Sequence, residues 1–203
     1  MFVRFMMKHN FLIVLFGFFT LTLSAEEANL QGLLNRITQQ TFSADFAMAV
    51  SEKVNEPMVY TGKMQIKGEK FTVFFNHLQV AFDGKTLYWL DKKANELTLS
   101  YPTPTELYEA NPFSYAQQMK SKCNETITAD KHVTTITLIP KEKESDVSKC
   151  ILKLNHTNWL LQSVEIKERS GKTTLLTFRN TKYSSENTTF SINQGDAYLN
   201  DLR

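Results

Sequence analysis

The sequence predicts an α+β fold, an open and incomplete antiparallel β-barrel of about ten or eleven strands. Three observations predict it. Apolar and polar residues alternate over much of the chain, short turns join the alternating segments, and only two regions have a helical pattern. Alternation with a period of two is typical of strands that bury one face. An N-terminal helix and a short helical lid are expected to close the barrel.

The alternation is strongest between residues 57 and 101, where Asp83-Gly84 is a typical hairpin turn. Large apolar side chains recur there at every second position of successive strands. Such a face either packs on another element or lines a cavity for an apolar ligand. We expect nine of these side chains to lie on one concave face: Met58, Tyr60, Met64, Ile66, Phe71, Val73, Phe75, Leu87 and Trp89.

The second half of the chain continues as strands joined by hairpins. Residues 155–158 and 170–172 have the composition of tight turns, and residues 140–148 form a charged loop. Strands are expected over His132–Ile139, Ile151–Leu154, Trp159–Glu168 and Thr173–Arg179.

Two helical regions stand out. Residues 27–40 place Leu30, Leu33, Leu34 and Ile37 on one stripe, which is the spacing of an amphipathic helix. Residues 102–120 are punctuated by proline, and Asn111 followed by Pro112 matches the start of a helix. This second region is either a lid or a crossover that packs permanently.

The first 25 residues predict a secretory signal peptide. Arg4 and Lys8 precede an apolar run from Phe11 to Leu23, and Ala25 ends a small-residue cleavage site. The run is shorter than the ~20 residues of a membrane span, although an uncleaved anchor is an alternative. We expect a soluble periplasmic protein, cleaved after Ala25, with residues 26–203 as a single domain.

Removal of that segment changes the charge balance. The chain has 23 basic and 21 acidic side chains, and the signal peptide contains two of the basic ones, which leaves 23 − 2 = 21 against 21. A balance near zero without a basic cluster gives no footprint for nucleic acid. We therefore expect no nucleic-acid partner. Separately, we expect the protein to be a monomer.

Two cysteines, Cys123 and Cys150, remain in the exported part. In an oxidising compartment such a pair is most simply a disulfide, and free thiols are the alternative. The chain has no motif of a hydrolase, metalloprotease or nucleotide-binding enzyme. Its histidines in the exported part, His77, His132 and His156, are scattered and typical of solvated surface residues. We expect no enzyme activity, no cofactor and no metal site.

Several segments, taken in order, resemble one family. They are Phe42-Ser43-Ala44-Asp45-Phe46, Gly62-Lys63-Met64-Gln65-Ile66-Lys67, Asp83-Gly84-Lys85-Thr86-Leu87-Tyr88-Trp89, Asn111-Pro112-Phe113 and the ending from Thr189-Phe190-Ser191-Ile192 to Asp201-Leu202-Arg203. The chain resembles the periplasmic outer-membrane lipoprotein carriers, the LolA family. The resemblance implies an open barrel whose apolar cavity holds lipoprotein acyl chains. It also implies an inner-membrane release complex and an outer-membrane acceptor as partners.

One turn departs from the family. LolA proteins commonly carry an Arg-Pro turn after the lysine that aligns with Lys67, and the arginine helps to control lipid release. Here the turn is Lys67-Gly68-Glu69-Lys70, without arginine or proline. Lysine lacks the planar, multi-donor guanidinium group. A different release mechanism, or a lipid other than a lipoprotein anchor, follows as an alternative.

Two functions are therefore weighed: a carrier and chaperone that shields lipoprotein acyl chains, and a module that binds or senses another amphiphile. A purely structural domain with a filled core is a third reading. In the carrier hypothesis, Phe113, Tyr115 and Ala116, with Leu33 and Ile37, fill the empty cavity. Flexible Met48, Met58 and Met64 let its wall repack. The expected cavity residues are Leu33, Ile37, Phe46, Met48, Met58, Tyr60, Met64, Ile66, Phe71, Val73, Phe75, Leu87, Trp89, Leu97, Leu99, Phe113, Tyr115 and Ala116.

Overall fold

A computed structural model describes residues 29–52, 56–104, 106–107 and 111–203, without the side chains of residues 112, 114, 115 and 118. The expected signal peptide lies outside the described residues. Among those described, no helix combines the length and apolar character needed to cross a membrane. The elements in chain order are α1 (Leu30–Gln39), β1 (Thr41–Ser51), β2 (Met58–Lys67), β3 (Lys70–Phe75), β4 (Leu78–Phe82), β5 (Leu87–Asp91), β6 (Glu96–Ser100), α3 (Pro112–Met119), the 3₁₀ turn η1 (Lys120–Lys122), β7 (Cys123–Ala129), β8 (Val133–Pro140), β9 (Val147–Asn155), β10 (Leu161–Glu168), β11 (Thr173–Ser184) and β12 (Tyr198–Asp201).

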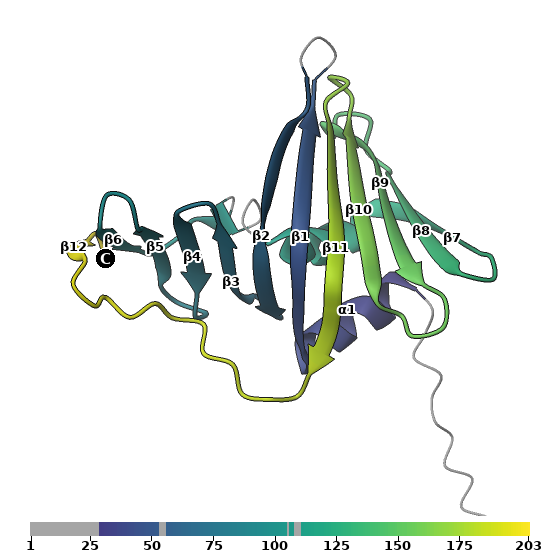
Figure 1. The fold of residues 1–203 in the computed structure, drawn as a ribbon. Helices are drawn as coiled ribbons and strands as arrows, with labels where there is room; N and C mark the ends of the chain where they lie inside the picture. Colours follow the sequence, from purple (N-terminus) through teal and green to yellow (C-terminus); the bar gives the residue numbers. More distant parts are fainter. Residues whose placement is uncertain (1–28, 53–55, 105, 108–110) are drawn as a thin grey trace, which may run out of the picture.

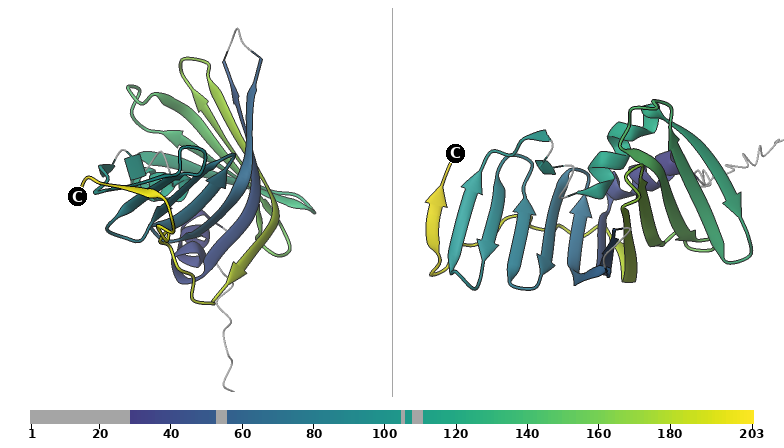
Figure 2. Two further views of the ribbon diagram at one scale, coloured as in Figure 1. Left: turned by 60° about the vertical axis from the view of Figure 1, so that its left-hand side comes forward. Right: turned by 90° about the horizontal axis from the view of Figure 1, so that it is seen from above.

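The strands form one sheet of 12 strands in the order β12-β6-β5-β4-β3-β2-β1-β11-β10-β9-β8-β7. Neighbouring strands pair antiparallel except β12 and β6, which are parallel. The long strands β1, β2, β10 and β11 stand at the centre (Figure 1). Seen from above, β7–β11 curl around α1 and α3, whereas β3–β6 and β12 extend away as a wing (Figure 2).

The sequence prediction of a barrel closed by helices is wrong. In the part of the chain that the structure describes, β12 and β7 are the edges of the sheet and no ladder joins them. The helix expected as a lid, α3, lies inside the curl and closes no barrel (Figure 2). The wing also buries part of its back face, because Leu97, Ile192 and Ala197 pack together there. A sheet half that is covered from behind does not have to roll up to bury its apolar residues.

The C-terminal segment provides that cover and the strand that the sequence analysis missed. From the end of β11 it runs along the sheet to β12 at the far edge (Figure 1). Thr188 and Thr41 share a hydroxyl hydrogen bond of 3.3 Å at its start, and the Phe190 side chain is buried. The segment ends as β12, whose Leu199 pairs with Leu97 of β6.

Helix α1 fills the lower end of the concave face. Asn29 is its N-cap, with Oδ1 accepting from the Gly32 N–H at 2.9 Å. The Glu125 carboxylate on β7 accepts from the Leu30 N–H at 2.8 Å. Negative charge at a helix N-terminus is stabilising because the free N–H groups and the helix dipole both favour it. The helix then buries Leu33 and Ile37 against the sheet.

Glycine at position 62 is required by close packing. A Cβ placed there would lie 1.9 Å from the Phe74 carbonyl oxygen and 2.8 Å from the Phe46 ring. Gly62 and Phe46 face each other on β2 and β1, so the ring lies over the bare backbone.

We therefore expect Gly62→Ala to lower the free energy of unfolding by on the order of 3 kcal/mol, since the neighbouring backbone has to shift. Thr61→Ala, on the exposed adjacent position, is the control and should change it by less than about 0.5 kcal/mol. Urea denaturation of both variants measures the difference. Equal midpoints for the two variants would contradict this account of Gly62.

Candidate functional site

The strand register places the nine large residues expected on one face on the same side of the sheet. Residues directly opposite in an antiparallel pair share a face. One row across the sheet contains Ile66, Phe71, Phe82 and Leu87, and the next contains Met64, Val73, Val80 and Trp89. Met58, Tyr60 and Phe75 complete the set, opposite Val50, Met48 and Gly62 respectively.

Burial divides this concave face into a packed end and a half-open end. Ile66, Phe71 and Met64 lie in the main core with α1, as do Leu33, Ile37 and Phe46. Near the opposite end of the strands, Met48, Tyr60, Val73 and Phe75 are only partly buried, as is Leu87 on β5. Met58 and Trp89 are 54% and 43% exposed. An apolar surface therefore continues beyond the packed core into the open.

Two expected cavity residues lie elsewhere. Leu97 and Leu99 of β6 pair with Leu90 and Tyr88, on the back face of the wing. There they pack with Ile192 and Ala197 of the C-terminal segment. Tyr115 belongs to α3, but its side chain is outside the described residues.

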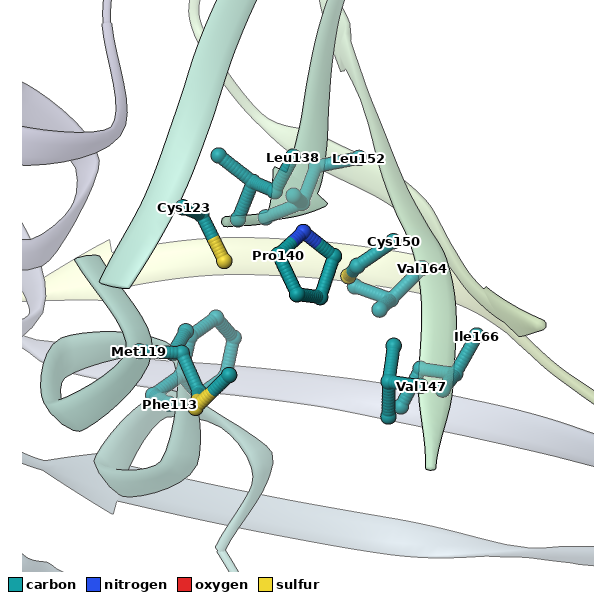
Figure 3. A pocket seen from close by; sticks show the side chains of 11 residues that line it. Phe113, Met119, Cys123, Leu138, Pro140, Val147, Cys150, Leu152, Val164 and Ile166 are labelled. Carbon is teal, nitrogen blue, oxygen red and sulfur yellow. The ribbon is translucent and has the colours of Figure 1, made fainter. Parts of the chain in front are cut away.

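A pocket lies between α3 and the curled strands (Figure 3). Phe113, Ala116 and Met119 of α3 form one wall. Strands β7–β10 form the other, and every described lining residue is apolar. The free volume is about 30 Å³, much smaller than the engineered apolar cavity of about 150 Å³ that binds benzene. The strand residues of the wall are Cys123, Leu138, Pro140, Val147, Cys150, Leu152, Val164 and Ile166.

Sequence reasoning missed this second wall. The sequence analysis did expect strands over His132–Ile139 and Trp159–Glu168. It carried no signal that these strands curl back toward α3, because the curl depends on the long-range pairing of β1 with β11.

Phe113 anchors α3 against the sheet. Its ring is 4% exposed and packs edge-on to Phe42, with ring centroids 5.4 Å apart. Phe42 also packs edge-on to Phe178 at 5.7 Å. Such edge-to-face pairs stabilise by about 0.5–1.5 kcal/mol beyond the burial of their area. Phe113 thus belongs to both the pocket wall and the core.

The turn that departs from the family pattern is bonded to both helices. Gly68, with φ +59°, donates its N–H to the Ile37 carbonyl oxygen of α1 at 2.9 Å. The Asn111 Nδ2 donates to the carbonyl oxygens of Gly68 at 3.2 Å and Glu69 at 3.4 Å. Backbone and amide groups therefore hold this turn, where LolA proteins commonly have an arginine.

A second, polar cavity adjoins the pocket. It has a volume of about 270 Å³ and shares Met119, Pro140 and Val147 with the pocket. Its other described lining residues include Lys122 and the acidic residues of the β8–β9 loop. Arg169 donates to the Ser145 carbonyl oxygen at 2.9 Å and holds that loop. An apolar pocket with a polar chamber beside it suits an amphiphilic ligand.

The structure does not contain the disulfide that the sequence predicts, because Cys123 and Cys150 are both free. They belong to β7 and β9, which flank β8. Two strand spacings are about 9–10 Å, beyond the ~7 Å between Cα atoms that a disulfide spans. Burial raises the pKa of the Cys150 thiol to about 12, and the neighbouring Cys123 adds to the shift. Burial also raises the pKa of Cys123, against the opposing charge of Lys141.

The comparisons with known proteins agree with this architecture. Residues 38–193 match the family model for the outer membrane lipoprotein carrier protein LolA, and the chain therefore belongs to that family. Family members are periplasmic proteins that bind or carry, and are not enzymes. No sequence among the curated proteins matches.

Three solved structures that are similar to the chain are distant from it in sequence. An uncharacterised conserved protein from Thermus thermophilus has a TM-score of 0.54 at 11% identity, over 84% of this chain and 98% of that one. A LolA superfamily protein from Nitrosomonas europaea has a TM-score of 0.39 at 10% identity, over 81% and 98%. A chain of the MucA/MucB complex from Pseudomonas aeruginosa has a TM-score of 0.41 at 11% identity, over 77% of this chain and 56% of that one.

The state of the cysteines gives a prediction. In the folded protein we expect neither thiol to react quickly with iodoacetamide at pH 8, because the raised pKa values keep both groups protonated and the thiolate is the reactive form. In urea without a reducing agent, both should be alkylated. Mass spectrometry counts the adducts. A native disulfide would instead leave the unfolded protein without adducts until a reductant is added.

Proposed function

We propose that this chain is a soluble periplasmic carrier that shields the acyl chains of lipoproteins and delivers them from the inner to the outer membrane. The observation that supports the proposal best is the wholly apolar pocket, which lies on a concave face that is apolar and partly open beyond it. Membership of the LolA family adds to it. Residues 26–203 act as one carrier domain after cleavage following Ala25.

The half-open concave face is where acyl chains lie in this proposal. Each methylene removed from water contributes about 0.8 kcal/mol, so covering even part of a chain gives useful affinity. Met48 and Met58 suit chains of different shape, because the methionine side chain is unbranched and flexible. Tyr60, Phe75 and Trp89 extend the same surface toward the wing.

The pocket fills itself when it is empty. Phe113, Ala116 and Met119 leave only about 30 Å³ free, so an acyl chain has to displace them. Part of the gain from burying the chain is then offset by the loss of these contacts. A carrier without an energy source needs such an offset, because several fully buried chains would otherwise bind too tightly to leave.

The polar cavity is assigned to the polar part of the ligand. It adjoins the apolar pocket at Met119, Pro140 and Val147 and is lined by charges of both signs. The release complex and the acceptor would then approach from that end. By resemblance to the family, these partners are an inner-membrane complex and an outer-membrane protein.

A second candidate is a module that binds or senses another amphiphile. One observation favours it: the β2–β3 turn lacks the arginine and proline common in LolA proteins and is bonded through Gly68 and Asn111 instead. Native mass spectrometry of protein purified gently from its own periplasm separates the two. A co-purified triacylated lipoprotein supports the carrier, and a free amphiphile alone supports the second candidate.

Replacing Phe113 tests the self-filling pocket. Phe113→Ser should remove side-chain contacts that an acyl chain otherwise has to displace. Lipid should then be retained more strongly, and its transfer to acceptor vesicles should become several-fold slower. Phe74→Ser makes the same change on the opposite face of the sheet, at a side chain that is 38% exposed, and is the matched control. Phe113→Leu, a milder change, serves if the serine variant is unstable. Retention and transfer that match those of the parent in both Phe113 variants would remove Phe113 from the release step.

The two tryptophans locate the bound chain. Trp89 is 43% exposed on the concave face, and Trp159 packs against the main core. In Trp159→Phe, we expect a fatty acid with a brominated chain to quench the fluorescence of Trp89 strongly. In Trp89→Phe, the remaining tryptophan should be quenched far less. The opposite order would place the chain away from the half-open face.

A further inference from the structure

Among the residues that the structure describes, Asn111 is the most deeply buried polar one, and it directly precedes α3. Its exposure is 0%, although asparagine is usually a surface residue. Its partners span two separate parts of the fold, the turn between β2 and β3 and the first turn of α3. A fully buried amide that connects two elements restricts how they move relative to each other, and so affects the pocket that α3 lines.

The two ends of the amide have different tasks. The Oδ1 atom accepts from the Phe113 N–H at 3.1 Å, as an N-cap does. The Nδ2 atom donates to the Gly68 and Glu69 carbonyl oxygens on the β2–β3 turn. The cap belongs to α3 alone, whereas the amide donors join α3 to the sheet.

The turn that receives these hydrogen bonds is itself fixed. Gly68 donates to Ile37 at the buried face of α1, and Ile37 is 2% exposed. The order of contacts is therefore α1, the β2–β3 turn, Asn111 and α3. These contacts fix the position of α3 relative to the packed core at the lower end of the sheet.

From α3, the contacts continue into the pocket. Phe113, Ala116 and Met119 form its inner wall, and the opposite wall is made by strands of the curl. A small displacement of the helix changes the pocket width directly, since only about 30 Å³ is free.

We infer that Asn111 is a positioning residue that sets the width of the apolar pocket, through its amide donors to the β2–β3 turn, and thereby limits which acyl chains it accepts. The inference rests on the proposed function for the nature of the ligand. The coupling of Asn111 to α3 does not depend on it. With the amide bonds in place, the wall favours slender, unbranched chains. Without them, α3 shifts more freely and the pocket admits bulkier ones.

Two substitutions separate the donors from the cap. Asn111→Asp keeps the shape and the N-capping oxygen but replaces the donor group by an acceptor that faces two carbonyl oxygens. Asn111→Ser also keeps a capping oxygen and adds no charge. Asn155→Asp is the matched control, because its Oδ1 caps a turn through the N–H groups of Thr157 and Asn158 at 2.9 and 3.1 Å, far from α3 in sequence.

Hydrogen exchange of the ligand-free protein tests the coupling without any lipid. In both Asn111 variants we expect amide protection in residues 113–119 to fall about tenfold, with protection in β9–β11 unchanged. The Asn155→Asp protein should match the parent. A uniform loss of protection over the whole chain would mean a general loss of stability, and unchanged protection would mean no coupling. Either result overturns the inference.

Ligand selectivity is the second readout. The probes are palmitic acid and its bulkier, methyl-branched analogue phytanic acid, measured by displacement of a fluorescent fatty acid. The parent should prefer the linear chain, so that its dissociation constant for phytanic acid exceeds that for palmitic acid. The ratio of the phytanic acid to the palmitic acid dissociation constant should fall at least threefold in both Asn111 variants. An unchanged ratio overturns the assignment. If no protein binds either probe but the exchange result holds, the proposed ligand class fails while the positioning role stands.

Discussion

An apolar sheet face that is larger than the helices available to cover it is the constraint on which this structure depends. The face runs without interruption from Phe46 of β1 to Leu87 of β5, because residues directly opposite in antiparallel strands share a side. Helix α1 covers one end, and α3 covers part of the remainder. The uncovered part, with Met58 and Trp89, costs free energy in water unless a ligand or a partner shields it. Binding is thus a consequence of the incomplete cover.

Polar contacts hold α1 in place at the packed end of the concave face, next to the half-open end. Glu125 of β7 accepts from the first N–H of α1, and Gly68 of the β2–β3 turn donates to its last buried turn. Helix α1 is therefore bonded to the curl at β7 and to the β2–β3 turn. Arg36 lies 4.0 Å over the Tyr183 ring and adds a contact to β11. These partly buried hydrogen bonds help to specify the position of α1, since a misplaced helix would leave them unmade.

How much of the fold could be predicted from the sequence depends on how far apart in the chain the interacting residues lie. Alternation is local, so it identified the strands and the shared face of Met64, Val73 and Trp89. The start of α3 was readable because Asn111 and Pro112 are a local capping signal. Curvature is not local: it depends on the pairing of β1 with β11, in which Ala47 lies opposite Thr177, and on cover from the far C-terminus. The predicted closure of the barrel, the cavity role of Leu97 and Leu99 and the disulfide all required that long-range geometry, and each differs in the structure.

The wing shows why the sheet remains open. In β4, Val80 and Phe82 face the concave side while Ala81 belongs to the cluster behind it, so short strands there bury both faces. A strand buried on both faces does not gain further by rolling inward. The C-terminal segment supplies the rear cover and ends as β12, which pairs with the exposed edge of β6. The same segment that stabilises the wing therefore keeps its front face extended, and so preserves the broad apolar surface on which the proposed binding depends.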